Sequence, residues 1–291
     1  ASFNISNTGY RMTSEDRLYN CLPLYHSTGL MLGLAAVVSS GASVFVRRKF
    51  SASLFWQEAQ RYQTTTFIYV GELCRYLSFQ EPCEDEKNNP IRAMVGNGLR
   101  PDLWDCFRDR FGVERICEIY GASEGACMFM NGLNKDKTIG MTNATVVLLK
   151  YDVASDELIK NDDGLCIEAE DEMPGLLAVK ISPDSPYNGY TDKKESEKKI
   201  LRNVLEEGDA WFNSGDLIKT MDVGFSVGQK HYQFVDRIGD TFRWKSENVS
   251  TNEVAEIINQ YSQVNMANVY GVQIPNAEGR AGMVAFNCDL N

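Results

Sequence analysis

Short apolar runs alternate with helix-like segments in the first 121 residues of the chain. The runs are RLYNCL (17–22), ASVFV (42–46), TTFIYV (65–70), IRAMVG (91–96) and ERICEIYG (114–121). Between them, SASLFWQEAQRY (51–62) and RPDLWDCFRDRFG (100–112) carry apolar residues at helical spacing. Strands that alternate with helices predict an α/β fold built on a parallel sheet.

The segment 100–112 has a clear helical pattern. Pro101 suits a first helical turn, and Gly112 supplies a stop. Four apolar residues share one face of this helix: Leu103, Cys106, Phe107 and Phe111. We expect this face in the core and not in a binding site.

Residues 19–46 include no side chain that is formally charged at neutral pH, so a membrane-spanning helix is one interpretation of this stretch. Pro23, His26 and the small residues 39–41 divide it. An apolar helix near 30–38, followed by a turn and the strand ASVFV, therefore fits better than one spanning helix.

The pattern changes after Thr145. From there to Ile181 it predicts strands, including LLAVKI, with a turn at 162–164. A Lys- and Glu-rich amphipathic segment, roughly Asp192 to Glu207, then predicts a helix whose charges form a solvated face.

Residues 234–258, FVDRIGDTFRWKSENVSTNEVAEII, predict a strand, a charged turn, a second short strand and a helix. The helix should begin at Ser250, because the Ser-x-x-Glu spacing lets its hydroxyl accept a hydrogen bond from the Glu253 backbone N–H. An ordinary surface hairpin followed by a helix explains this segment equally well when it is taken alone.

Composition indicates a folded globular protein of roughly two domains or one large one. The chain has 291 residues, of which 43% are hydrophobic, and its formal net charge is −11. A nucleic-acid surface needs clustered Lys and Arg, whereas the densest basic cluster here is Arg47-Arg48-Lys49. We therefore expect no nucleic-acid partner.

The cysteines favour a reducing compartment. The chain has eight cysteines and two histidines, and no Cys-x-x-Cys pair, so a zinc site is not expected. The thiols are scattered along a chain too long for a disulfide-framework protein. The start, ASFNISNTGY, shows no signal-peptide pattern.

Several short motifs are candidates for ligand contacts, although each has an ordinary structural explanation. Glycine turns follow two predicted strands, at 95–101 and 121–123, where a parallel sheet can present backbone to a ligand. Asp216 follows a predicted Ser-Gly turn, and one carboxylate can accept from two ribose hydroxyls. His26 lies in an apolar stretch, where a satisfied core histidine is the more common case.

Together and in this order, the motifs resemble the adenylate-forming superfamily of acyl-CoA synthetases, luciferases and peptide-synthetase adenylation domains. The segments PLYHSTG, GNGLRPDLWDCFRDRFG, EIYGASEG, GDTFRWKSENVSTNEV and VYGVQIPNAEGRAGM look most like its fatty acid transport protein and very-long-chain acyl-CoA synthetase branch. The similarity runs from about Asp16 to Phe286, with a divergent middle from Asn131 to Asp171.

The resemblance implies an α/β fold that covers part of a large AMP-binding domain, residues 1–238, with a β-rich part at about 145–238. Residues 239–291 would form a hinge and the first part of a small α+β C-terminal domain. The phosphate loop that such proteins carry ahead of this region, and their late C-terminal lysine, are not in the sequence. On this interpretation the chain is a fragment that keeps part of the adenine pocket, does not complete the reaction and tends to self-associate.

The implied activity is ATP-dependent conversion of a long- or very-long-chain fatty acid to an acyl-adenylate, followed by thioester formation with coenzyme A. ATP, Mg²⁺ and coenzyme A would take part, and the protein would be cytoplasmic, either free or peripheral to a membrane. Two alternatives stay open: a ligase for another acid, such as a bile acid or a small polar carboxylate, and a non-catalytic module for fatty-acid uptake or binding. Glu124, Asp216 and Arg237 together favour an enzyme, because a scaffold needs none of them.

The resemblance also implies roles for individual residues. The catalytic candidates are His26 near the reacting carboxylate, Ser123 as a donor to phosphate, and Glu124 as the Mg²⁺ ligand. The nucleotide candidates are Gly96, Asn97, Gly98, Glu118, Tyr120, Gly121, Asp216 and Arg237, with Tyr120 against the adenine face, Glu118 near the exocyclic amine and Asp216 on the ribose. Gly239 and Asp240 would form the hinge, and Trp244, Lys245, Ser246 and Glu247 would face coenzyme A.

Overall fold

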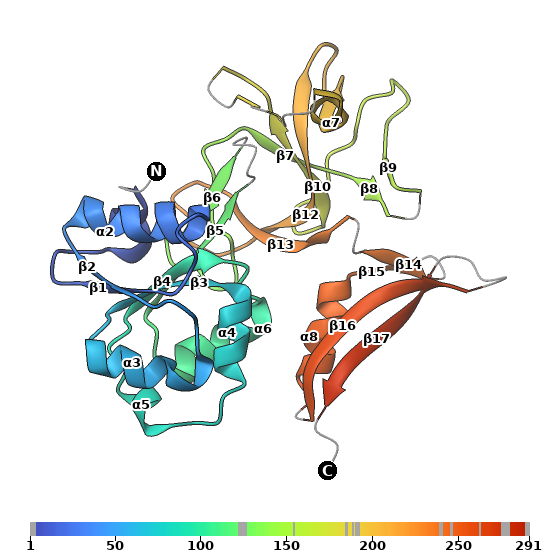
Figure 1. The fold of residues 1–291 in the computed structure, drawn as a ribbon. Helices are drawn as coiled ribbons and strands as arrows, with labels where there is room; N and C mark the ends of the chain where they lie inside the picture. The colour runs from blue at the N-terminus through green and yellow to red at the C-terminus, as the bar shows by residue number, and fades with distance from the viewer. Residues whose placement is uncertain are drawn as a thin grey trace. The chain divides into compact units, whose positions relative to one another are not determined.

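A computed structural model describes residues 4–121, 127–153, 155–183, 186–187, 189, 193–238, 241–244, 247–261, 263–274 and 280–288. The chain divides into two compact units. The first comprises Ala1–Tyr120 and Phe129–Met141, and the second comprises Gly121–Met128 and Thr142–Asn291. Figure 1 shows the helices and strands of both.

A six-stranded sheet forms the centre of the first unit. Its strands are β1 (Arg17–Asn20), β2 (Ser43–Val46), β3 (Thr66–Val70), β4 (Ala93–Asn97), β5 (Arg115–Gly121) and β6 (Met128–Met130), in the order β2-β1-β3-β4-β5-β6. The pairs β1–β2, β1–β3, β3–β4 and β4–β5 are parallel. The five apolar runs of the early sequence are thus confirmed as strands of an α/β sheet.

Helices and single helical turns precede β1 or connect these strands. They are η1 (Ile5–Tyr10), η2 (Thr28–Leu34), α2 (Ala35–Ser40), η3 (Ala52–Leu54), α3 (Phe55–Tyr62), α4 (Gly71–Ser78), α5 (Glu84–Lys87), α6 (Pro101–Asp105) and η4 (Cys106–Arg110). The helix expected near 30–38 corresponds to η2 and α2, and the strand ASVFV corresponds to β2. Among the residues described, no helix is both long and apolar enough to cross a membrane.

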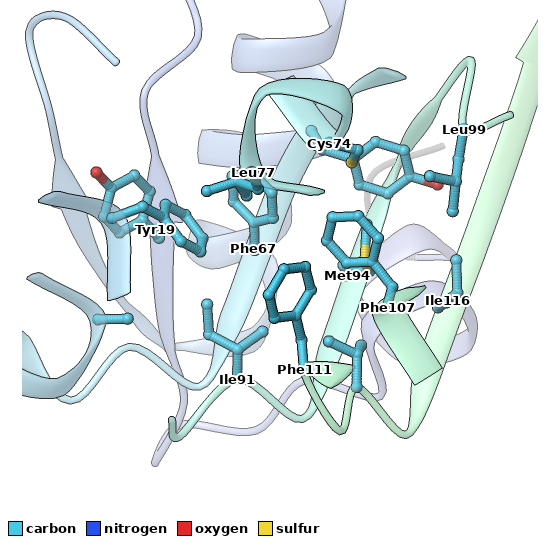
Figure 2. Close-up of a cluster of buried hydrophobic side chains, with 14 of the residues drawn as sticks. Tyr19, Phe67, Cys74, Leu77, Ile91, Met94, Leu99, Phe107, Phe111 and Ile116 are labelled. Atoms are coloured by element: carbon cyan, nitrogen blue, oxygen red, sulfur yellow. The ribbon is translucent and has the colours of Figure 1, made fainter. Parts of the chain in front are cut away.

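The sheet is buried on both faces, which explains its nearly continuous apolar strands. On one face, Phe67 and Met94 pack with Leu77 of α4 and with Phe107 and Phe111 (Figure 2). On the other face, a separate cluster joins the strands to η1 and α2. The face predicted for segment 100–112 is confirmed, because Phe107 and Phe111 are buried and Leu103 and Cys106 pack against the same cluster.

The second unit contains a five-stranded sheet in the order β11-β12-β10-β7, with β13 paired to β12. Its strands are β7 (Val146–Leu149), β10 (Gly175–Lys180), β11 (Ile200–Arg202), β12 (Ala210–Met221) and β13 (His231–Arg237). Two further short strands, β8 (Tyr151–Asp152) and β9 (Glu157–Leu158), pair with each other. The predicted strand LLAVKI and the turn at 162–164 are confirmed.

The helix predicted to reach Glu207 is wrong beyond Lys198. Helix α7 spans only Lys193–Lys198, and β11 follows it and pairs antiparallel with β12. Leu201 also packs with the cluster around Trp211. Strand pairing with β12 and the packing of Leu201 outweigh the local helical pattern. That pattern depends only on neighbouring residues and does not reflect the later strand β12.

The last described part of the chain, residues 241–288, is here called the C-terminal module. It contains β14 (Phe242–Trp244), β15 (Glu247–Val249), α8 (Thr251–Asn259), β16 (Val264–Gln273) and β17 (Arg280–Cys288). The predicted strand, which is β13, and the predicted helix, which is α8, are confirmed, but two short paired strands, β14 and β15, lie where one was predicted. Ser250 is the N-cap of α8, and its hydroxyl accepts from the Glu253 backbone N–H at 3.3 Å.

Candidate active site at the end of the parallel sheet

Two glycines meet where β3 and β4 end, one at the start of α4 and one in the turn after β4. Val70 and Asn97 are the last residues of these strands and pair with each other, and Gly71 and Gly98 follow directly. A Cβ on Gly71 would lie 1.7 Å from the Gly98 carbonyl oxygen, and Gly98 has φ +80°. Only glycine allows both the close approach and the left-handed backbone conformation.

Gly96 has a different neighbour from the one that the sequence suggested. A Cβ at this position would lie 2.2 Å from the Tyr69 carbonyl oxygen and 2.6 Å from the first ring carbon of Tyr69. Packing between adjacent strands therefore accounts for glycine here without any ligand. Its contact with a nucleotide stays a prediction, as does that of the exposed Asn97 and Gly98.

Glu118 on β5 supports the β4 turn from within. Its Oε1 accepts from the Leu99 backbone N–H at 3.1 Å and from the Gly98 backbone N–H, and its Oε2 forms a hydrogen bond with the Tyr69 hydroxyl. The side chain is buried, with 3% of its surface exposed. The sequence pointed to Glu118 as an adenine contact, whereas its described partners belong to the scaffold of the site.

Burial raises the pKa of the Glu118 carboxyl to about 8, and its three hydrogen-bond donors act in the opposite direction. Burial also raises the pKa of Tyr69 well above its usual value. A protonated carboxyl fits these contacts, because Oε1 is then a carbonyl oxygen facing two N–H groups and Oε2 shares a proton with the Tyr69 oxygen.

The raised pKa predicts a pH-dependent stability. An unfolded glutamate titrates near pH ~4.3, so between about pH 4.3 and 8 the unfolded chain releases a proton that the folded chain keeps. The free energy of unfolding of the wild type relative to Glu118→Gln should therefore fall by about 1.4 kcal/mol per pH unit through this window and level off above it. Urea denaturation of both proteins at several pH values tests this, and parallel profiles would contradict it.

His26 lies on the surface at the same edge of the sheet. The side chain is exposed, so the common alternative of a buried core histidine does not hold. The Thr28 backbone N–H donates to His26 Nδ1 at 3.2 Å, and the Thr28 hydroxyl donates to Asn97 Oδ1 at 3.4 Å. Thr28 thus connects His26 to the end of β4, a link that a single sequence offers no means to predict.

Tyr120 and Gly121 end β5. The Tyr120 ring is partly exposed and packs edge-on against Phe129, with ring centroids 5.6 Å apart. Gly121 is exposed. These features leave part of the Tyr120 ring accessible, as its predicted contact with adenine requires. Ser123 and Glu124, which follow this strand, lie outside the described residues.

Asp216 and Arg237 face each other across β12 and β13. They are paired in the strand register, with Arg237 Nε 3.6 Å from Asp216 Oδ1. The Asp216 side chain is largely buried and Arg237 is 74% exposed, so the arginine contributes little to stability and is accessible to a ligand. The structure thus joins two candidates that are separated in sequence.

The predicted Ser-Gly turn before Asp216 is wrong, because the segment lies inside the continuous strand β12. The pairing with β10 passes from Asn213 opposite Ala178 to Leu217 opposite Leu176, so residues 214–216 form a bulge. Gly215 has φ +77° in this bulge. A bulge can re-aim a side chain within a sheet, which explains how a strand residue becomes a site candidate.

The hinge and coenzyme A candidates are described only in part. Gly239, Asp240, Lys245 and Ser246, as well as the side chain of Glu247, lie outside the described residues. Trp244 is partly buried and packs against the cluster around Phe242 in the C-terminal module.

The described residues include no group of three or more His, Cys, Asp or Glu side chains arranged for a metal ion. Mg²⁺ in nucleotide-dependent enzymes is usually held by one or two carboxylates together with the substrate's phosphates and water. Glu124 is the proposed carboxylate.

The sequence profile of the AMP-binding enzyme family matches residues 1–169. The chain belongs to this family. The match covers the parallel sheet, Gly71, the turn at Gly98, and Glu118, whereas Asp216 and Arg237 lie beyond it.

Relatives extend the similarity through the C-terminal module. The medium/long-chain-fatty-acid–CoA ligase of Mycobacterium tuberculosis is 43% identical over 277 residues, which is 95% of this chain and 45% of that protein. Long-chain fatty acid transport protein 6 of Homo sapiens is 43% identical over 280 residues, or 94% of this chain and 44% of the relative. The chain thus spans about half the length of the curated relatives that it matches.

Solved structures show the same fold at low sequence identity. ATP-bound MatB from Rhodopseudomonas palustris matches with a TM-score of 0.75 at 18% identity, over 99% of this chain and 53% of that one. The anthranilate CoA ligase AuaEII in complex with anthranoyl-AMP matches with a TM-score of 0.73 at 16% identity, over 98% and 52%. Both the expected fold class and the resemblance to the fatty acid transport protein branch are confirmed.

Proposed function

We propose that this chain forms the nucleotide-binding part of an enzyme that activates a fatty acid with ATP to an acyl-adenylate and then forms the coenzyme A thioester. The main support is the family match, together with similarity along nearly the whole chain to relatives named as fatty-acid–CoA ligases and fatty acid transport proteins. The paired Asp216 and Arg237 add a specific feature that a lipid-binding scaffold does not need.

The proposed roles follow from the chemistry of the first step. A carboxylate is a poor electrophile and is repelled by the triphosphate, so activation requires cationic charge near the phosphates and a good leaving group. Glu124 would hold Mg²⁺, which when bound neutralises charge on the phosphates. Asp216 would accept from the ribose hydroxyls, with Arg237 beside it, and Tyr120 would present its exposed ring area to the adenine.

His26 is proposed at the entry of the acyl group. It is exposed and is joined through Thr28 to Asn97 at the end of β4. A donor or acceptor at this point would orient the reacting carboxylate toward the nucleotide side of the sheet. Thr28 acts as a positioning residue in this arrangement.

Pyrophosphate release by the full-length protein tests the activity directly. We expect acid-dependent release that is largest with long-chain fatty acids when the assay is run over a panel of acids. A preference for bile acids or small polar acids would favour the alternative ligase. Lack of release with every acid, combined with fatty-acid binding, would favour the uptake or binding module.

The assignment of Glu124 has its own test. Glu124→Gln in the full-length protein should slow adenylation about 100-fold or more while weakening ATP binding much less, because charge neutralisation matters most in the transition state. Single-turnover adenylate formation and ATP binding should both be measured. Glu114→Gln, at an exposed glutamate just before β5, is the matched control. Near-normal adenylation by Glu124→Gln would refute the assignment.

The proposal also includes three further predictions from the sequence. They are peripheral membrane association, self-association of residues 1–291, and the contacts of Trp244, Lys245, Ser246 and Glu247 with coenzyme A. Sedimentation of the purified chain with and without anionic vesicles would examine the first two.

A further inference from the structure

A buried carboxylate joins β13 to the C-terminal module. Asp236 lies near the end of β13 and is 1% exposed. Its Oδ2 accepts from the Ser250 hydroxyl at 3.0 Å, from the Thr251 backbone N–H at 2.9 Å and from the Thr251 hydroxyl at 3.2 Å. Its Oδ1 accepts from Asn252 Nδ2 at 2.8 Å and from the Arg237 backbone N–H at 2.9 Å.

These bonds link two parts of the chain that have separate cores. The C-terminal module is centred on Phe242, Ala255 and Val269, whereas the β-rich part has its own cluster around Leu149 and Trp211. Neither cluster, as described, includes a residue of the other part. The module therefore keeps its internal packing if the contacts at Asp236 open.

A cavity lies beside the contacts of Asp236, lined by its chain neighbour Val235 and by its donor Ser250. This cavity of about 440 Å³ lies between the two parts, and its lining includes Leu217 and Val235 on one side and Ser250 and Glu253 on the other. Water in a cavity of this size and mixed polarity can solvate Ser250, one of the donors to Asp236, when the joint opens. A polar joint of this kind opens without exposing an apolar core, because water replaces the lost hydrogen bonds.

We propose that Asp236 is a positioning residue that holds the C-terminal module in one orientation, and that the module leaves this orientation only when the bonds from Asp236 to residues 250–252 break. The hydrogen bonds bias a two-state equilibrium, so weakening them populates the second orientation. Any consequence for catalysis rests on the proposed function and on the hinge that the resemblance to adenylate-forming enzymes implies between adenylation and thioester formation.

Asp236→Asn is a sharp test because the two side chains have the same shape. One oxygen of an amide can replace Oδ2, but the NH₂ group then faces the Asn252 amide and the Arg237 backbone N–H, which are both donors. Asp209→Asn is the matched control. Asp209 is also buried and accepts from three backbone N–H groups and from Trp211 Nε1, all inside the β-rich part.

The first measurement is native-state trypsin cleavage of residues 1–291 at Arg237, Arg243 and Lys245, followed by mass spectrometry. We expect cleavage at least tenfold faster in Asp236→Asn than in Asp209→Asn, because cleavage reports the population of the opened state. The double variant Thr251→Val/Asn252→Ala loosens the same joint without changing residues next to Arg237, and should show the same acceleration. Equal cleavage rates in all variants would overturn the proposal.

The second measurement uses the full-length protein and compares pyrophosphate release without coenzyme A to thioester formation with it. Asp236→Asn should change the ratio of the two rates at least threefold, and Asp209→Asn should leave it unchanged even if it lowers the melting temperature. An unchanged ratio in Asp236→Asn would overturn the catalytic consequence. Absence of pyrophosphate release from the wild type would instead reject the proposed function, while the cleavage assay would still decide the role of Asp236.

Discussion

Glu118→Ala is expected to lower the free energy of unfolding of the chain by about 3 kcal/mol at about pH 6. The substitution leaves the fully buried Tyr69 hydroxyl and the buried Leu99 backbone N–H without their acceptor. Each buried polar group that loses its partner costs about 1–3 kcal/mol, and the removed side chain leaves a cavity as well. Urea denaturation followed by circular dichroism measures the change.

Two further variants separate this effect from general sensitivity to mutation. Glu118→Gln keeps the volume and one acceptor oxygen, so its cost should be clearly smaller than that of Glu118→Ala. Glu114→Ala removes an exposed glutamate four residues earlier in the same region and should change stability by about 0.5 kcal/mol or less. Equal losses for Glu118→Ala and Glu114→Ala would show that the carboxyl does not support the β4 turn.

Gly96→Ala is expected to cost a similar amount, about 3 kcal/mol or more, and to broaden the unfolding transition. The added Cβ would lie 2.2 Å from the Tyr69 carbonyl oxygen, so β3 and β4 must separate locally. Overpacking of a well-packed interior costs typically about 1–3 kcal/mol, and backbone has less room to yield than a side chain. Differential scanning calorimetry of the purified chain is the direct measurement.

Gly121→Ala is the matched control at the end of the next strand. A Cβ there has its nearest neighbour at 3.4 Å, which is ordinary contact, and the expected loss is below about 1 kcal/mol. Adding Tyr69→Ala to Gly96→Ala should not restore stability, since the closest clash involves the backbone of Tyr69. Rescue by Tyr69→Ala, or similar losses at both glycines, would contradict the proposed cause.

Local patterns in the sequence were sufficient for most of the secondary structure. Periodicity identified the strands of the parallel sheet and the buried face that includes Phe107 and Phe111. The capping box identified the start of α8 at Ser250. These features depend on residues that are neighbours in sequence, so a single chain contains all the information that they need.

Candidate site residues were found through the order of several motifs and not through any one of them. That order led to Gly98, Glu118, Asp216 and Arg237, and the structure brings the last two together. The order of the motifs could not reveal that the described hydrogen bonds of Glu118 go to Tyr69 and to the turn at Gly98, because Tyr69 and Glu118 are 49 residues apart. Residue type alone does not distinguish a ligand contact from a scaffold contact of this kind.

Contacts between distant segments decided the remaining features. Residues after Lys198 pair with β12 instead of extending α7, and the bulge at Gly215 exists only because β10 pairs with both of its ends. Glycine is required at position 96 because Tyr69 of the adjacent strand leaves no room for a Cβ. Asp236 accepts hydrogen bonds from residues 250–252, a contact that the sequence pattern around the charged turn does not indicate. The sequence alone determined most of the segments that form strands and helices, because these depend on local spacing and caps. Only the tertiary structure determined which residues contact the buried polar groups and the glycines, because those contacts depend on strand pairing across long separations in sequence.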